Sequence, residues 1–452
     1  MSEVAAPVTA SRAAVPVWVR FFAPVPPIAA LSTDPVVVER AFGKWQGRVL
    51  LFSIIGYATF YLVRKNLPIA MPLMQDELHL NKSVLGLFIT LHGVLYGIAK
   101  FTNGFLGDRC NARAFFVVGL AGSAALNIMF GFGSTAFILG LIWMLNGWFQ
   151  GMGFPPCARL LTHWFSPKQL ATKMSIWNTS HCIGAVVILI LGGFLITYGW
   201  RLCFFVPAVI ALVVVALLWF TMPDTPASVG LPEVEGTHVE TVAGQPADDF
   251  KTVLLDKVFL NKNVWLVSIA NFFVYILRYA VFDWGPTLLH ETKHITVQHA
   301  AWMLAGFEVA GAFGALTAGW ITDRWFAGRG MRVGLFYMVI AGVSLLLFWK
   351  VGTESRILNL TFLCAIGFFV YGPQCLIGIA AANLATKRAA ATAVGLTGLF
   401  GYLSTVVSGW GLGTLVKYHG WDAGFVGLLI VAAIGTVLFA VCWPAKAHGY
   451  KT

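Results

Sequence analysis

Apolar residues fall into long runs that are separated by short polar turns along most of the chain. A helix needs about 20 mostly apolar residues to cross a bilayer. Twelve runs reach that length, so the sequence predicts an all-α membrane protein with many spans. Their predicted limits are 48–73, 84–106, 113–132, 135–160, 170–197, 201–222, 264–289, 297–321, 331–351, 356–383, 391–416 and 421–443.

One long polar stretch, residues 223–263, interrupts this pattern and holds seven acidic residues and four prolines. It predicts a linker between an N-terminal six-helix bundle, 46–222, and a C-terminal six-helix bundle, 264–443. Residues 1–45 and 444–452 are predicted to be tails. Prolines interrupt the apolar part of the first tail, which makes it neither a spanning helix nor a signal peptide.

Composition agrees with this prediction, because 58% of the residues are hydrophobic and only 11% are charged, against roughly 25% charged residues in soluble domains. Most lysines and arginines lie on the inside if the N-terminus is inside, which predicts a cytoplasmic linker and two cytoplasmic tails. The net charge of +11 then reflects topology, and no basic block with interleaved aromatics indicates nucleic-acid binding. The seven cysteines show no ligand spacing and predict neither a disulfide nor a metal site.

The two halves of the chain repeat each other. The turn after the second run contains Asp108-Arg109, and the turn after the eighth contains Asp323-Arg324, each four residues beyond a glycine. The two aspartates lie almost as far apart in sequence as Arg64 and Arg278, each of which follows a tyrosine by three residues. Two unrelated features that repeat after nearly the same number of residues indicate a duplicated unit. Transporters built from such repeats bind their substrate between the halves, near the middle of the membrane.

Six lysine, arginine and acidic residues lie more than five residues from either end of a predicted span and demand an explanation. Charged groups at membrane depth are costly, about 2.5–3.5 kcal/mol each on the lenient scale. Four of the six are cationic and two are acidic, which leaves two positive charges to be neutralised. A phosphate monoester carries roughly −1.5 to −2 charges, and arginine binds phosphate oxygens in a bidentate manner. The six are Arg64, Lys65, Lys100, Arg278, Asp283 and Glu308.

Roles for these residues follow from symmetry and helix geometry. Arg64 and Arg278 are predicted to hold one anion between the halves, although salt bridges to the two acids would also explain them. Lys65 would point about 100° away from Arg64 on a helix, so we expect it to pair with Asp283 or Glu308. Lys100 lies near the end of its run, and either a substrate contact or extension toward the membrane surface fits it.

Other polar residues are candidates to line the same site. His181 lies one helical turn after Asn178, and its titration range overlaps that of phosphate, so a substrate or proton role is predicted for it. Tyr61, Tyr275 and Tyr402 are candidate hydroxyl donors, although single tyrosines are often packing residues. His92 is interpreted as a packing residue. The candidate substrate-binding set is therefore Arg64, Arg278, His181, Lys100, Tyr61, Tyr275, Tyr402 and Asn178.

The repeated Gly-x-x-x-Asp-Arg turn resembles the loop motif of the major facilitator superfamily. The resemblance implies a fold of twelve transmembrane helices in two pseudo-symmetric bundles. It also implies that the turn residues take part in gating on the cytoplasmic face. The residues concerned are Asp108, Arg109, Asp323 and Arg324.

Further motifs resemble one branch of that superfamily, the organophosphate:phosphate antiporter family. They are Tyr275-Ile-Leu-Arg278-Tyr with Asp283-Trp284-x-Pro286, Trp177-Asn178-x-x-His181, Val370-Tyr371-Gly372-Pro373-Gln374, and Gly395-Leu-Thr-Gly-Leu-Phe-Gly401-Tyr402. The resemblance implies that Arg64 and Arg278 bind phosphate, that His181 and Lys100 serve transport, and that pairs among Lys65, Asp283 and Glu308 rearrange. The family pattern places Arg-Gly where this chain has Leu170-Ala171, and Asn where it has Cys182.

The resulting hypothesis is a secondary transporter, not an enzyme, that exchanges a sugar phosphate for inorganic phosphate without a cofactor. Glucose 6-phosphate is favoured because Asp283-Trp284-Gly285 and Pro373-Gln374 resemble the hexose-phosphate members most. Three alternatives stay open, namely a glycerol-3-phosphate:phosphate antiporter, a hexose-phosphate membrane sensor, and a proton-coupled organic anion symporter. We expect a monomer in a bacterial inner membrane, with the lipid bilayer and small phosphorylated substrates as its partners.

Overall fold

The computed structural model describes residues 21–31, 34–107, 110–234, 255–351, 355–384 and 390–444. The described residues are almost entirely helical, and no strand occurs among them. This confirms the predicted all-α class. The α-helices are α2 Pro35–Leu62, α3 Leu67–Glu77, α4 Lys82–Gly107, α5 Ala112–Phe132, α6 Ala136–Gln150, α7 Phe154–Trp164, α8 Pro167–Asn178, α9 Ser180–Leu195, α10 Leu202–Thr221, α12 Lys262–Lys293, α13 Val297–Trp325, α14 Gly330–Lys350, α15 Arg356–Leu384, α16 Ala390–Leu403 and α17 Leu412–Val441.

Within the described residues, eleven helical segments are long and apolar enough to cross a membrane, where the sequence predicts twelve. The difference arises in the last segment, Thr392–Val441, which covers both of the final predicted spans. Gly420 inside it has φ 75° and ψ 178°, outside the helical region. Glycine adopts this conformation without a steric penalty, so the chain reverses there and the two predicted spans remain separate.

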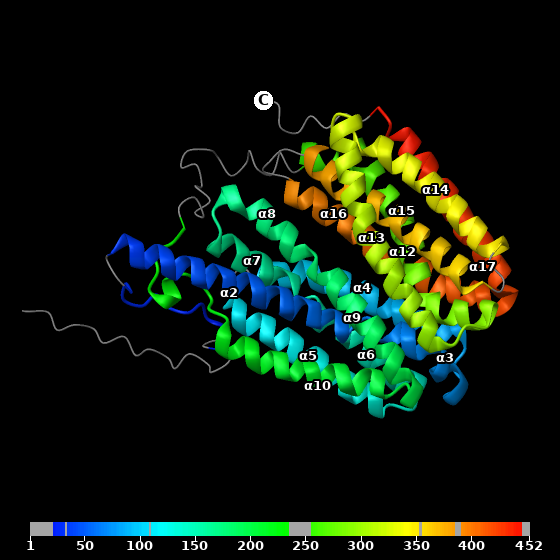
Figure 1. Ribbon diagram of the computed structural model, residues 1–452, viewed down its shortest axis with the longest axis horizontal. Helices are drawn as coiled ribbons and strands as arrows, with labels where there is room; N and C mark the ends of the chain where they lie inside the picture. Colours follow the sequence, from blue (N-terminus) through cyan, green and yellow to red (C-terminus); the bar gives the residue numbers. More distant parts are fainter. Residues whose placement is uncertain are drawn as a thin grey trace, which may run out of the picture.

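The helices form two groups (Figure 1), with α2 to α10 in blue to green and α12 to α17 in green to red. Short π-helical turns, Leu255–Phe259 before α12 and Val406–Gly411 after α16, complete the second group. We call the end of the molecule that carries Asp224 the linker end. The opposite end, which carries Glu77 and Lys82, is called the far end.

Three predicted spans of the first group are interrupted in the structure. The first breaks over residues 63–66 between α2 and α3, the fourth over 151–153 between α6 and α7, and the fifth at Thr179 between α8 and α9. Prolines lie in the first turns of α3 and α7, where the missing N–H is tolerated, whereas the same residue would disrupt a continuous helix.

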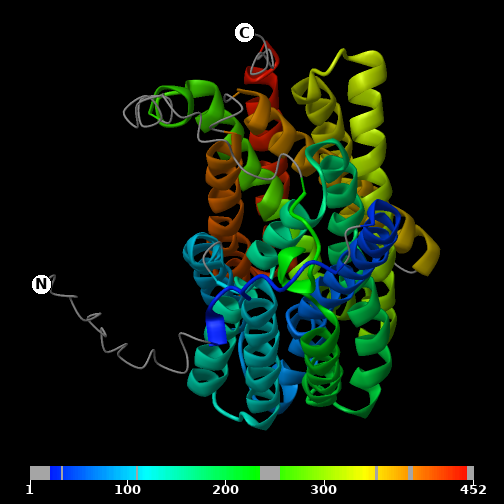
Figure 2. The ribbon, with the colours of Figure 1, turned by 90° about the vertical axis from the view of Figure 1, so that its left-hand side faces the viewer.

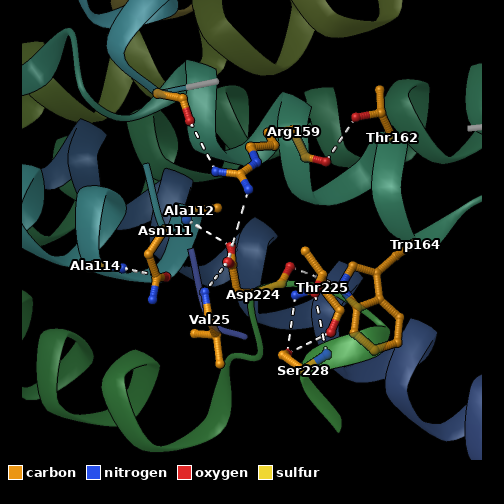
Figure 3. A network of polar contacts seen from close by, with 11 residues as sticks. Val25, Asn111, Ala112, Ala114, Arg159, Thr162, Trp164, Asp224, Thr225 and Ser228 are labelled. Carbon is orange, nitrogen blue, oxygen red and sulfur yellow. Dashed lines mark hydrogen bonds and ion pairs between the residues drawn. The ribbon is translucent and has the colours of Figure 1, made fainter. Parts of the chain in front are cut away.

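Polar side chains bind the chain together at the linker end (Figure 3). The buried carboxylate of Asp224 accepts hydrogen bonds from the amides of Val25 at 3.2 Å and Ala112 at 2.9 Å. It also lies 4.0 Å from the guanidinium of Arg159, while the Asp224 carbonyl accepts from Trp164. Asp224 thereby joins the segment before α2 to the first residue of α5, to α7 and to the start of the linker.

Residues 21–31 lie across this end of the first group, where Figure 2 shows the blue start of the described chain. The ring of Phe21 stacks on Trp219 at 5.5 Å, and the Phe22 carbonyl accepts from the Asn111 amide at 2.8 Å. Helix α2 then begins at Pro35, earlier than the predicted span, with the Asp34 side chain accepting from Val36 as a helix N-cap.

Contacts between the two groups gather at the far end. Glu291 of α12 accepts from Lys82 at 3.1 Å, Gln75 at 3.3 Å and Trp421 at 2.7 Å. The hydroxyls of Ser83 and Thr414 lie 2.8 Å apart. These bonds join α3 and α4 of the first group to α12 and α17 of the second.

Just below these bonds, small residues bring α4 against the π-helical turn Val406–Gly411. A Cβ on Gly86 would collide with the carbonyl oxygen of Gly409. The Thr90 hydroxyl donates to the Thr405 carbonyl at 2.7 Å and accepts from the Trp410 amide at 2.9 Å. Small residues allow helices to approach closely in membranes, and here they close the far end.

Candidate ligand-binding site

A cavity lies between the two groups, beneath the far-end contacts. It contains about 600 Å³ of empty space, part of it open to solvent, and α2, α3, α4, α6, α12 and α16 contribute to its walls. Both arginines predicted from the repeat reach it. Its lining residues are Tyr61, Arg64, Lys65, Leu67, Pro68, Ile89, His92, Gly93, Tyr96, Trp143, Arg278, Tyr279, Asp283, Tyr402 and Thr405.

Arg64 and Lys65 lie in the break between α2 and α3, so the expected helical separation of about 100° does not apply to them. Both side chains line the cavity. The Arg64 guanidinium lies over the rings of Tyr61, at 4.0 Å, and Tyr96, at 5.0 Å. Aromatic faces attract cations, but they leave N–H donors unused, and Nε of Arg64 is buried without a hydrogen-bond partner.

Buried amides from neighbouring helices hold this break in place. The carbonyl of Val63 accepts from Asn127 of α5 at 2.8 Å and from Asn146 of α6 at 3.0 Å, and the Phe60 carbonyl accepts from Gln150 at 3.1 Å. On the other side of the break, Asn66 donates to Asn127 at 2.8 Å. Backbone groups freed inside a membrane must find such partners, so these amides fix where Arg64 and Lys65 project.

Arg278 is held differently from Arg64. One guanidinium nitrogen donates to Gln374 at 2.9 Å and another to the Tyr371 hydroxyl at 2.8 Å. That hydroxyl in turn donates to Glu308, whose other carboxylate oxygen is buried without a partner. Arg278 therefore reaches an acid through a tyrosine instead of through a direct salt bridge.

Lys65 forms an ion pair with Asp283 at 2.9 Å, across the boundary between the two groups. Their side chains are only 13% and 9% exposed. Of the two acidic partners considered for Lys65, the structure places Asp283 at the cavity and Glu308 behind Tyr371. With Lys65 and Asp283 neutralising each other, the charge left at the cavity wall is that of the two arginines.

The remaining cation and the tyrosines lie around Tyr402. The Lys100 ammonium lies 5.4 Å from the centre of the Tyr402 ring and 4.7 Å from that of Phe154, and no described carboxylate lies within 4 Å of it. Tyr402 lines the cavity and packs edge to face with Tyr96. Tyr275 lies behind this layer, with its hydroxyl accepting from Gln374 at 3.2 Å.

His181 and Asn178 lie beside the cavity and outside its lining. The ring of His181 is 5.9 Å from that of Tyr61, its Nδ1 bonds the carbonyl of Asn178, and its Nε2 lies 3.3 Å from the Cys182 sulfur. Asn178 ends α8 and is exposed. The ring of Tyr61 therefore lies between His181 and the cavity.

One of the two turns implied in gating lies among the described residues, at the end of α13. Asp323 and Arg324 occupy the last turn of α13, and both are exposed. Asp108 and Arg109 lie outside the described residues. The structure therefore describes one of the two repeated turns, and its residues are outside the lining of the cavity.

Two groups of functional residues were missed by sequence reasoning. His92, interpreted there as a packing residue, lines the cavity with its Nε2 buried and unpartnered. The amides around the break were not singled out either. Their signal in the sequence is the presence of Asn66, Asn127, Asn146 and Gln150 inside otherwise apolar runs.

The two-bundle fold with a cationic cavity at the interface defines the class as a multi-pass integral membrane protein of the transporter type. The family model described as Major Facilitator Superfamily matches residues 53–409, more than half of the chain. The chain belongs to the Major Facilitator Superfamily, as its loop motif indicates.

Relatives with names cover almost the whole chain. The probable hexose phosphate transport protein of Chlamydia trachomatis is 38% identical over 96% of this chain and 98% of its own length. The glycerol-3-phosphate transporter of Bacillus subtilis is 37% identical, covering 93% and 97%. The membrane sensor protein UhpC of Escherichia coli is 36% identical, covering 92% and 96%. These similarities confirm the resemblance to the organophosphate branch of the superfamily.

A similarity to a solved structure supports the fold alone. A bacterial homologue of the human lysosomal transporter Spinster, in an inward-facing and occupied conformation, superposes with a TM-score of 0.74. The similarity covers 88% of this chain and 96% of that protein, at 14% sequence identity. Folds of this kind host many substrates, so the substrate has to be argued from the site.

Proposed function

We propose that this protein is a sugar-phosphate:inorganic-phosphate antiporter. The observation that supports this proposal most is the charge of the cavity. Arg64 and Arg278 both line it, while Lys65 is neutralised by Asp283. Two cations at membrane depth with no carboxylate in direct contact are unfavourable, and a phosphoryl group of roughly −1.5 to −2 charges would balance them.

The two arginines would bind the phosphoryl group from the two halves at once. Arg64 offers a guanidinium with an unused Nε donor, and Arg278 offers one that Gln374 and Tyr371 orient. A ligand held by both halves draws them together and favours the closed intermediate from which either end can open. Because that intermediate needs the anion, return of the empty carrier is slow and exchange is enforced.

The bonds around Glu291 and Thr90 close the far end, so the state described is one in which substrate reaches the cavity from the linker end. Both termini and the linker are proposed to be cytoplasmic, on the balance of lysine and arginine. The state is then inward-facing, and substrate uptake begins once the far-end bonds break.

Glucose 6-phosphate is the proposed organic substrate, and glycerol 3-phosphate is the second candidate. Relatives named for hexose phosphate and for glycerol 3-phosphate are almost equally similar, at 38% and 37% identity. The hydroxyl-rich cavity wall of Tyr61, Tyr96, Tyr279 and Tyr402 favours a sugar, since phenol hydroxyls both donate and accept hydrogen bonds.

Counterflow tests this proposal. Proteoliposomes loaded with inorganic phosphate should accumulate labelled glucose 6-phosphate, and unloaded vesicles should not. A matched experiment with labelled glycerol 3-phosphate ranks the two substrates. Accumulation that is equal with and without internal phosphate contradicts obligate exchange.

One other function class has a specific observation in its favour. The similarity to the sensor UhpC, at 36% identity, is close to that of the transporters. A sensor should bind glucose 6-phosphate in detergent yet give almost no counterflow. A proton-coupled symporter is distinguished by a collapsed pH gradient, which should abolish its uptake and leave phosphate exchange largely intact.

A further inference from the structure

His92 lies in the middle of α4 with its ring fixed against α6. Its ring stacks on Trp143, with centroids 5.3 Å apart and planes inclined by 28°. Its Nδ1 lies 3.1 Å from the carbonyl oxygen of Trp143. A carbonyl only accepts hydrogen bonds, so this contact assigns the proton of the neutral ring to Nδ1. Nε2 is then an acceptor.

That acceptor has no partner within the protein. His92 is 9% exposed, and its Nε2 is buried with no hydrogen-bond partner. Buried polar atoms in folded proteins nearly always have a partner, and an exception calls for an explanation. The same side chain lines the central cavity together with Arg64 and Tyr96, so the missing partner can come from a molecule bound there.

The position of His92 on α4 supports this explanation. His92, Tyr96 and Lys100 follow one another at intervals of four residues, which places them on one face of the helix. Tyr96 lies beneath the Arg64 guanidinium, and Lys100 lies over Tyr402. His92 is the member of this row nearest the closed far end, and Gly93 beside it packs on Thr405 of that closure.

The charges around the cavity define what His92 can bind. Arg64, Lys65 and Arg278 supply donors for an anion, and the Asp283 carboxylate is paired with Lys65. A neutral imidazole acceptor adds nothing for a fully deprotonated phosphoryl oxygen, which itself only accepts. It suits a hydroxyl, either the P–OH of a protonated phosphate or an alcohol on the carbon skeleton of a phosphate ester.

We propose that His92 is a specificity-determining residue whose Nε2 accepts a hydrogen bond from a hydroxyl of the bound substrate. This inference rests on the proposed function as a phosphate-ester carrier, since it requires a hydroxyl-bearing anion in the cavity. It assigns to α4 a contact that recognises the substrate by something other than its charge.

The test compares KM and kcat for two exchange reactions in proteoliposomes, phosphate against phosphate and glucose 6-phosphate against phosphate. His92→Phe keeps a ring on Trp143 and removes both nitrogens. His92→Gln places an amide near the position of Nε2, and His92→Asn reaches only the position of Nδ1. We expect KM to rise about five- to twentyfold in the Phe and Asn variants, with kcat within twofold, and to recover in the Gln variant.

The matched control is His290→Phe on α12. Its Nδ1 also lies 3.1 Å from a carbonyl, that of Ile295, but its side chain is outside the cavity lining. This variant should leave both KM values unchanged. If His92→Phe does not fold, the difference in KM between the Gln and Asn variants tests the same hydrogen bond.

The two reactions separate the two sources of the hydroxyl. A raised KM for both substrates assigns the P–OH group, and a raised KM for glucose 6-phosphate alone assigns a sugar hydroxyl. Unchanged KM values for both in the Phe and Asn variants overturn the inference. If the wild type shows no exchange, the proposed antiport fails instead, and calorimetric titration with phosphate and glucose 6-phosphate applies the same comparison to Kd.

Discussion

Arg64 and Arg278 occupy equivalent positions in the two halves, yet their guanidinium groups are held by different contacts. Arg278 is fixed by Gln374 and Tyr371, while Arg64 rests on two aromatic faces with an unused Nε. For the proposed phosphate site, the difference implies a preformed half on the second bundle and an adaptable half on the first. A ligand that accepts the missing hydrogen bonds of Arg64 should gain more binding free energy from Arg64 than from Arg278.

Replacing either arginine by lysine keeps the charge and removes the planar fork. Arg64→Lys and Arg278→Lys should each lower kcat/KM for phosphate exchange by tenfold or more, because hydrogen bonds to charged groups contribute about 1.5–3 kcal/mol each. Initial rates in phosphate-loaded proteoliposomes measure this. Full activity in both variants contradicts bidentate recognition by the two guanidinium groups.

The Lys65–Asp283 pair gives a prediction about stability. Removing one partner leaves an unpaired buried charge, so Lys65→Met and Asp283→Leu should each lower the free energy of unfolding by about 3–5 kcal/mol. The double variant should regain most of the loss. Thermal unfolding of the four proteins in one detergent gives the coupling energy, and additive losses would show that the ion pair in the structure contributes little.

At the scale of elements, the break between α2 and α3 decides the geometry of the site. Arg64 and Lys65 are adjacent in sequence, and the break lets both side chains line the same cavity. On a continuous helix, one of the two would point away from it. The break depends on amides from α5 and α6, so residues that never touch a ligand determine where the ligand-binding groups lie.

Asn127→Leu removes the donors to Val63 and Ser123 and the acceptor for Asn66. Each buried group left unsatisfied costs about 1–3 kcal/mol, so we expect a clear fall in the unfolding temperature and a raised KM, because the break moves Arg64. Asn359→Leu is the control, since Asn359 is buried on α15 away from the break. The control variant should change stability only. An unchanged KM in the Asn127→Leu variant as well would show that these amides do not position the binding site.

Asp224 gives a second prediction at this scale. Asp224→Ala leaves the amides of Val25 and Ala112 without their acceptor. Hydrogen exchange at Val25 and its neighbours should accelerate, while exchange in α12 to α17 should stay as in the wild type. Equal protection at Val25 in both proteins would show that Asp224 does not hold the segment.

Sequence patterns predicted the elements far better than their interruptions. Apolar runs, the repeated aspartates and the paired arginines suffice for the two-bundle fold and for the charged residues at the cavity wall, whereas His92, Tyr96 and Tyr279 of that wall were not among the candidates. The break at 63–66 was not predicted, because apolar residues continue on both sides of it, whereas the kink at Gly420 lies in the turn 417–420 between the last two predicted spans. The orphan Nε2 of His92 depends on the ring contact with Trp143 of another helix, which no local pattern encodes.

At the scale of the whole molecule, the bonds between the halves gather at one end. Ion pairs and hydrogen bonds around Glu291 combine there with glycines that let α4 touch Gly409 and Thr405. Opening that end requires these contacts to separate together. The proposed alternating access would require this closure to open and close as one unit.

A disulfide across this closure should arrest the cycle. The hydroxyls of Ser83 and Thr414 lie 2.8 Å apart, so the side chains at these two positions already meet across the closure. Exchange by the Ser83→Cys/Thr414→Cys variant should fall at least tenfold on oxidation and recover with a reductant, while each single variant stays insensitive. Unimpaired exchange by the oxidised, cross-linked protein would mean that this end does not open during transport.

The segment 21–31 also has a practical consequence for watching the cycle. It is fastened to the first bundle by Asp224 and by the stacking of Phe21 on Trp219, so a fluorophore at Ile28 travels with that bundle as a rigid marker. Paired with a second dye on α14, it converts the rocking of the halves into a single-molecule energy-transfer signal. Such a readout needs no label inside the cavity, and the residues proposed to bind the anion can stay as they are.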